Sequence, residues 1–317
     1  MAEWLVEQGI GEERAILREG DEILAARLYW PGALTAGQVE EAKLVFRTAG
    51  SRRGTARFAS GEEALVSGLS RDAGEGATLR LKVTRAAIAE AGRTKLAQAR
   101  PSDEAPRSAP SLAEALGARI VPRFEGWDEL IADAFARKIE FDGGALWLSA
   151  TPAMTLLDID GPLAPPQLAL AAIPAIAAAV KRLDIGGSVG IDFPTLSDKA
   201  HRRAVDRALA EALDDWPHER TAINGFGFVQ LVARLEGPSI LQRIAADRAG
   251  AAARLLLRRA EAVAGPGALL LSCHPAVGAK LGEEWRAELA RRTGRTISVE
   301  TNPALPLEGG HAQTISR

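Results

Sequence analysis

The stretch GGALWLSATPAMTLLDIDG, residues 143–161, and the stretch KRLDIGGSVGIDF, residues 181–193, decide the fold. The apolar run within each stretch ends at a carboxylate, Asp158 in the first and Asp192 in the second. The residues between the two runs are rich in Ala, Leu and Ile, which predicts a helix packed on a sheet, and the pair Gly186-Gly187 predicts its end. The segment therefore predicts a strand, a helix and a second strand.

A helical crossover makes two such strands parallel neighbours with a right-handed connection, so both carboxylates should leave the sheet at the same edge. Ligands of open α/β sheets bind at that edge. Two carboxylates close together suit Mg²⁺, which prefers carboxylates, waters and substrate phosphate as ligands. Asp160 would point to the same side of an extended strand as Asp158 and could add a further oxygen. The alternative is that these aspartates only start turns, since Asp160-Gly161 is a turn dipeptide.

The composition excludes several classes of protein. The chain has 317 residues, with 39 Lys plus Arg against 41 Asp plus Glu, so a nucleic acid would have to be bound by a local basic patch. The single cysteine, Cys273, excludes an intramolecular disulfide and a cysteine-rich zinc site, and it favours a reduced, cytoplasmic setting. The opening residues, MAEWLVEQGIGEERA, lack the pattern of a signal peptide, and no apolar run reaches the roughly 18 residues of a membrane span. We therefore expect a soluble protein without a membrane partner.

The first hundred residues predict mainly β-structure. A hairpin closed at Glu19-Gly20-Asp21 opens the chain. Short runs separated by glycine-containing turns then predict strands at Val39–Arg47, Gly54–Phe58, Glu63–Val66 and Thr78–Thr84. Short strands at this density are typical of a small barrel of the OB type.

The loop from Arg47 to Arg57 is basic and has an aromatic residue at each end, Phe46 and Phe58. Its candidate RNA-binding residues are Arg47, Arg52, Arg53, Arg57 and Phe58. Bases stack on aromatic rings while Arg binds phosphate, so this pattern favours binding of single-stranded nucleic acid. In the alternative interpretation, the turn is a solvated hairpin tip and its aromatic neighbours belong to the barrel core.

The segment ARPSDEAPRSAPS, residues 99–111, is rich in Pro, Ser and charge and predicts a linker. We therefore expect a β-rich, reduced OB-like region at 1–100, a linker at 101–111, an α/β region at 112–235 and a small α/β domain at 236–317. In the last of these, the pattern predicts one long basic helix at Ile240–Val263 and another helix at Ala276–Thr293, with strands at Ala268–Ser272 and Thr296–Thr301.

An amphipathic helix is predicted from Asp198 to Leu213, with Ser197 or Asp198 as its cap. Its first turns contain four basic side chains that could hold RNA phosphate near a metal: Lys199, His201, Arg202 and Arg203. Alternatively, these residues form a charged face turned to solvent.

The segment 153–205, with AMTLLDID, KRLDIGGSVGIDF and HRRAV in this order and spacing, resembles the catalytic region of the RNase E/RNase G endoribonucleases. The preceding GWDELIADAFARKIEFDGGALWLSATPAMT and the later INGFGFVQL are similar to the same family. The resemblance implies a catalytic Mg²⁺ held by Asp158 and Asp192 in a DNase I-like or RNase H-like α/β region. It also implies an assisting role for the residue at position 160, which is usually Asn in the family and is Asp in this chain.

Two departures from the family pattern bear on function. The zinc-binding CPxCxG motif is missing, so we expect no zinc-linked dimer. The arginine that often precedes Phe-Gly, and that belongs to the family's pocket for a 5′-monophosphate, is Gly225 here.

Together these patterns predict an Mg²⁺-dependent endoribonuclease that cuts single-stranded RNA, either rRNA precursors or mRNA, by metal-activated water and leaves a 5′-phosphate and a 3′-hydroxyl. The alternative is a catalytically weak RNA-binding or ribosome maturation factor that keeps the fold.

Overall fold

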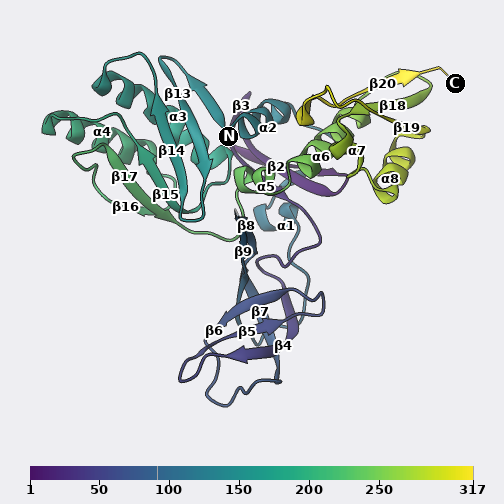
Figure 1. The fold of residues 1–317 in the computed structure, drawn as a ribbon, viewed down its shortest axis with the longest axis horizontal. Helices are drawn as coiled ribbons and strands as arrows, with labels where there is room; N and C mark the ends of the chain where they lie inside the picture. Colours follow the sequence, from purple (N-terminus) through teal and green to yellow (C-terminus); the bar gives the residue numbers. More distant parts are fainter. Residues whose placement is uncertain (91, 317) are drawn as a thin grey trace.

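The computed structural model describes residues 1–90 and 92–316. It shows a mixed α/β protein with two hydrophobic cores: one fills a small barrel, and a larger one joins the remaining elements. The barrel lies apart from the rest of the molecule, at the bottom of Figure 1. Among the described residues, no helix has the length and apolar character needed to cross a membrane.

The barrel confirms the predicted OB type. It is closed in the order β10-β6-β5-β4-β7, from strands β4 (Val39–Arg47), β5 (Arg53–Arg57), β6 (Glu63–Ser67), β7 (Thr78–Arg85) and β10 (Ala97–Pro101). Only the β6–β10 pair is parallel among these, which is the five-stranded connectivity of an OB-fold. A short hairpin, β8 (Ile88–Glu90) and β9 (Arg93–Lys95), lies between β7 and β10 in the chain.

The opening hairpin packs with the larger core and not with the barrel. Strands β1 (Glu3–Gly9), β2 (Glu12–Glu19) and β3 (Glu22–Tyr29) form an antiparallel sheet that β11 (Arg119–Ile120) extends beside β1. The chain thus leaves this sheet for the barrel and returns to it. On the way back, Val39 and Arg107 exchange two backbone hydrogen bonds of 2.9 Å, so the expected linker is held against the first barrel strand before α1 (Leu112–Leu116) begins.

The predicted strand, helix and strand are confirmed as β14 (Thr155–Asp160), α3 (Pro165–Arg182) and β15 (Gly187–Asp192). They lie in the middle of a six-stranded sheet of order β12-β13-β14-β15-β17-β16, in which only β14 and β15 are parallel. The outer strands are β12 (Lys138–Phe141), β13 (Gly144–Ala150), β16 (His218–Arg220) and β17 (Phe228–Ala233).

One face of this sheet is buried and the other is open. In β14, Thr155, Leu157 and Ile159 are buried, whereas Asp158 and Asp160 are exposed. Helix α3 contacts β12, β13 and β14 and packs against α4 (Lys199–Ala212), and α2 (Trp127–Ala136) contributes Trp127 and Phe135 to the same core. The carboxylates therefore lie on the open face, away from the helices.

The C-terminal part corrects two of the predicted helices. The helix expected at Ile240–Val263 is two helices, α5 (Ile240–Ala246) and α6 (Arg248–Glu261), because Asp247 has a non-helical backbone and its side chain caps α6 by accepting from the Gly250 N–H at 3.0 Å. The helix expected at Ala276–Thr293 is also divided, into α7 (Pro275–Gly278) and α8 (Glu283–Thr293). A small sheet of order β19-β18-β20 completes this part, from β18 (Ala268–Cys273), β19 (Ile297–Thr301) and the unpredicted β20 (His311–Ile315).

Helix α6 ties this C-terminal part to the opening sheet. The Arg254 guanidinium lies between the rings of Trp30 and Trp285, at 4.2 and 4.7 Å from their centroids. Arg258 is buried and pairs with Glu7 at 3.0 Å. The larger core therefore continues from the first strands into the C-terminal helices.

Candidate active site

Asp158 and Asp192 are register partners on the parallel strands β14 and β15. Neighbouring strands lie about 4.8 Å apart, and side chains of directly paired residues project from the same face. Both aspartates are exposed on the open face of the sheet. The structure thus brings together the two carboxylates that the sequence placed at one edge.

Asp160 lies on the same face, two residues further along β14, where its register partner is Ala145. Neither its carboxylate nor that of Asp158 has a hydrogen-bond or ion-pair partner within the described part of the chain. β14 ends at Asp160, and the chain bends at Pro162 and Leu163. Asp160 therefore ends the strand and also lies on the face of the carboxylate pair.

The electrostatics of the pair are those of two uncompensated like charges. Partial burial raises the pKa of the Asp192 carboxyl, and the negative charge of Asp158 raises it further. A cation between the two carboxylates would relieve this repulsion. Over residues 1–90 and 92–316, no group of three or more His, Cys, Asp or Glu side chains is placed to hold a metal. A cation bound by Asp158 and Asp192 would therefore take its other ligands from water and substrate.

Gly190 makes room beside the pair. A Cβ at this position would lie 2.6 Å from Cζ of Phe228 and 2.8 Å from the sulfur of Met154. The glycine of the SVGID run therefore allows an aromatic ring and a thioether to pack on the open face two residues before Asp192.

The basic residues at the start of α4 have different environments. Asp198 caps the helix by accepting from the Ala200 N–H at 2.6 Å, as predicted. Arg202 donates to the Ser197 carbonyl at 2.8 Å and also to that of Leu196, so its guanidinium holds the loop between β15 and α4. The other three predicted residues, Lys199, His201 and Arg203, are exposed.

A tight loop before β17 displays an aromatic ring that the sequence analysis did not single out. The Asn224 side chain accepts from the N–H groups of Phe226 and Phe228 at 2.9 and 3.0 Å, and the Gly227 carbonyl accepts from the Phe193 N–H at 3.1 Å. The loop is thereby fixed beside the end of β15, and Phe226 is 83% exposed at its tip. An exposed Phe between two glycines, Gly225 and Gly227, was the available signal.

The barrel residues predicted to bind RNA divide into two groups. Arg47 and Arg52 donate to backbone carbonyls of the 68–73 loop, Arg52 to Leu69 at 2.8 Å, and Arg57 pairs with Glu63 at 2.8 Å. Arg53 is exposed at the start of β5. The first three guanidinium groups therefore support the barrel, which leaves Arg53 as the freest of the four for phosphate.

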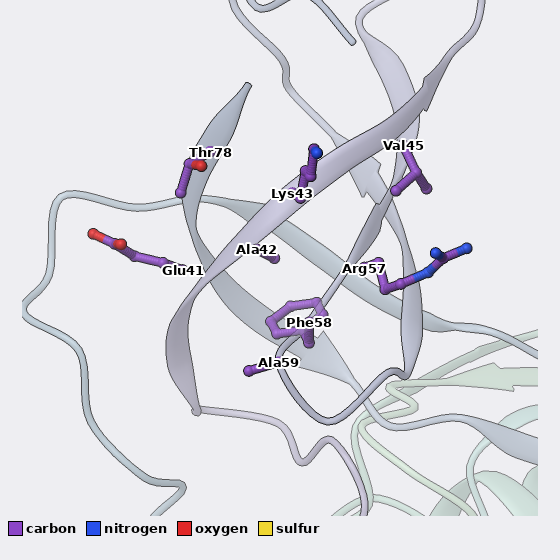
Figure 2. Close-up of a pocket in the computed structure, with 8 residues that line it drawn as sticks. All are labelled: Glu41, Ala42, Lys43, Val45, Arg57, Phe58, Ala59 and Thr78. Atoms are coloured by element: carbon purple, nitrogen blue, oxygen red, sulfur yellow. The ribbon is translucent and has the colours of Figure 1, made fainter. Parts of the chain in front are cut away.

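Phe58 is buried and forms the floor of a hollow of about 420 Å³ on the outside of the barrel. Figure 2 shows its ring below the strand that bears Lys43, and the Arg57 side chain extends to the right of the ring. The hollow is lined by Glu41, Ala42, Lys43, Val45, Arg57, Phe58, Ala59 and Thr78. Phe58 therefore belongs to the barrel core, as the alternative interpretation of the basic turn predicted. The hollow beside it is open to solvent.

The barrel contacts the sheet through the β8–β9 hairpin. The Lys95 ammonium donates to the Pro152 carbonyl at 2.9 Å, in the loop that precedes β14. The Ala86 N–H donates to the Glu236 carbonyl at 2.8 Å, just after β17. Both contacts lie at the edge of the sheet where β14 and β15 begin, opposite to the edge at which Asp158 and Asp192 stand.

Comparison with known proteins gives one family. No curated protein matches the chain at a significant level. The sequence model of the Ribonuclease E/G family matches residues 61–234, more than half of the chain, and this range includes most of the barrel, the six-stranded sheet and both paired aspartates. The chain therefore belongs to the Ribonuclease E/G family.

Proposed function

We propose that this protein is an Mg²⁺-dependent endoribonuclease that cuts single-stranded RNA and leaves a 5′-phosphate and a 3′-hydroxyl. Family membership supports a ribonuclease in general. The observation that supports the specific chemistry is the register pair Asp158 and Asp192 on an open sheet face.

The donor set fits Mg²⁺ better than it fits a closed metal cage. Two carboxylates without a cationic partner face the same space, and Mg²⁺ is commonly bound through one or two carboxylates with waters and phosphate oxygens completing the octahedron. When bound, Mg²⁺ activates water and neutralises charge on a phosphoryl group. Asp158 and Asp192 would hold the ion, and Asp160 would accept a hydrogen bond from one of its waters.

The rest of the chain would bind and position the RNA. Arg53 and the hollow beside Phe58 offer positive charge and an open apolar surface on the barrel. Lys199 and Arg203 offer exposed positive charges at the start of α4, and His201 offers an exposed ring beside them. The buried, free thiol of Cys273 is compatible with the reducing cytoplasm that we propose as the setting.

The test is incubation of the purified protein with a single-stranded RNA labelled at the 5′ end, with Mg²⁺ and with EDTA. We expect discrete products only with Mg²⁺, and end-group analysis should give a 5′-phosphate and a 3′-hydroxyl. The double variant Asp158→Asn, Asp192→Asn is the matched control for a contaminating nuclease. RNA binding without cleavage under all conditions would contradict the proposal and favour the alternative, an RNA-binding or ribosome maturation factor.

A further inference from the structure

One row of paired residues crosses the open face of the six-stranded sheet. Each member is the register partner of the next, on five successive strands from β12 to β17: Lys138, Trp147, Asp158, Asp192 and Phe228. Directly paired residues project from the same face, so the two carboxylates have an aromatic residue on each side.

Trp147 is unusually exposed for a large aromatic residue in the middle of a sheet. Its exposed fraction is 44%, although its neighbours in β13, Leu146 and Leu148, are buried. The Lys138 ammonium lies 5.3 Å from the centre of the indole ring and is itself paired with Glu140 at 2.8 Å. The ring is thus held in place beside Asp158 and keeps a large surface open to solvent.

Phe226 provides the second aromatic surface. It lies two residues before Phe228, the register partner of Asp192, and the loop that displays it is hydrogen-bonded to Phe193. Its side chain is the most exposed large apolar one after Met1 in the described part of the chain, at 83%. Packing in the core does not account for a phenylalanine at position 226, because most of its ring is exposed to solvent.

We infer that Trp147 and Phe226 stack on two bases of the RNA, one on each side of the phosphate held at Asp158 and Asp192. The inference rests on the proposed function. Trp147 and Phe228 are three strand spacings apart, roughly 14 Å, and Phe226 precedes Phe228 by two residues, so Trp147 and the loop of Phe226 lie on opposite sides of the carboxylate pair. Single-stranded RNA is the occupant that matches this row, because its bases stack on aromatic faces without a fixed sequence and its phosphates suit a site that holds a cation.

Bases stacked on these two rings would be held in a fixed position relative to the carboxylates. Strands β13 to β17 form a continuous hydrogen-bonded sheet, so Trp147 and the loop of Phe226 are fixed relative to the carboxylates. Bases held at both ends would align the intervening phosphodiester with Asp158 and Asp192. Trp147 and Phe226 are therefore positioning residues and not catalytic ones.

The experiment uses a short single-stranded RNA in which each nucleotide in turn is abasic. Its affinity for wild type and for Trp147→Ala, Trp147→Phe, Phe226→Ala and Phe226→Leu is measured by fluorescence anisotropy in EDTA, and the cleavage site is mapped separately with Mg²⁺. Leu170→Ala, at an α3 residue that is also 44% exposed, is the matched control. Thermal unfolding of each variant reports on folding.

We expect one abasic position on each side of the cleavage site to weaken wild-type binding about five-fold or more. Trp147→Ala should abolish the sensitivity at one of these positions, Phe226→Ala at the other, and Trp147→Phe should restore most of it. Alanine variants with the wild-type abasic profile would overturn the inference, while wild-type cleavage with Mg²⁺ would leave the proposed function intact. If the wild type does not cut, the proposed function fails, and the abasic profile in EDTA still reports whether the two rings stack on bases.

Discussion

Asp158 and Asp192 are paired residue to residue on the only two parallel strands of a six-stranded sheet. Their separation is therefore set by the hydrogen-bonded ladder and not by flexible loops. Such a fixed pair of like charges is stable only because the face is open to water, and it is suited to hold a divalent cation.

We predict that Asp158→Asn and Asp192→Asn each lower the rate of Mg²⁺-dependent cleavage by orders of magnitude, because each removes a metal ligand. RNA affinity in EDTA should change little. Glu219→Gln, an exposed residue of β16 in the same sheet, is the control and should cleave like wild type. Activity within a few-fold of wild type in either aspartate variant would contradict the assignment of the site.

The pKa of Asp192 gives a second prediction. Burial and the charge of Asp158 both raise this pKa, so ionisation of Asp192 weakens the fold. The stability that the neutral Asp192 carboxyl contributes is fully present below the ordinary pKa of an aspartate, about 3.9, and it is lost as the pH rises through the raised pKa. Asp192→Asn should therefore unfold at the same temperature as wild type or higher at pH 7 without metal. In Asp158→Asn, NMR titration should give a lower pKa for Asp192; an unchanged pKa would show that the two charges do not interact.

Asp160 should tolerate the amide that the wider family uses. The side chain is exposed and has no ion-pair partner within the described residues, and asparagine keeps an oxygen acceptor at the same place. We expect Asp160→Asn to keep activity within a few-fold of wild type and Asp160→Ala to lose considerably more. Equal activities of the two variants, measured as single-turnover rates, would exclude an accepting role for this position.

The parts of the structure that local patterns dictate were predictable. The strand at Val39–Arg47, the helix that Asp198 caps and the pair of strands that bear Asp158 and Asp192 are predictable because periodicity, caps and glycine turns agree there. The density of short strands predicts a small barrel, whereas the order of its strands is seen only in the structure.

The remaining features depend on tertiary pairing. β20 has a polar sequence, HAQTI, and forms a strand only because β18 pairs with it. The break at Asp247 was hidden because the apolar pattern continues across it, while a side-chain cap decides the backbone. Trp147 has the sequence environment of a buried strand, and its place beside Asp158 follows from the register between β13 and β14.

The barrel arginines should separate into structural and RNA-binding residues. Arg52 donates to the carbonyls of Leu69 and Gly68, so Arg52→Gln should lower the unfolding temperature and leave the salt dependence of RNA binding nearly unchanged. Arg53 is exposed, and Arg53→Gln should reduce the slope of log affinity against log salt by about 0.7. A slope that is reduced only in Arg52→Gln would contradict this assignment, because it would make Arg52 and not Arg53 the phosphate contact.

The last prediction concerns the 5′ end of the substrate, where the wider family uses an arginine before Phe-Gly and this chain has Gly225. The arginines that could replace it are engaged: Arg47 donates to carbonyls of the 68–73 loop, and Arg123 donates to the Arg258 carbonyl at 2.9 Å. Without a guanidinium at position 225, the chain lacks the bidentate, charge-assisted contact that an arginine there would make with a terminal phosphate.

We therefore expect 5′-monophosphorylated and 5′-hydroxyl versions of one RNA to be cut at similar rates, by entry at internal single-stranded sites. Gly225→Arg is a test of the missing group, because a Cβ at this position meets no atom within 4 Å and the longer side chain can be accommodated. If one guanidinium is sufficient, the variant will prefer the monophosphate while wild type does not; if the rest of the pocket is also needed, both will cut the two RNAs equally. A ten-fold preference in wild type, about 1.4 kcal/mol, would contradict the prediction, since discrimination of that size requires a dedicated phosphate contact.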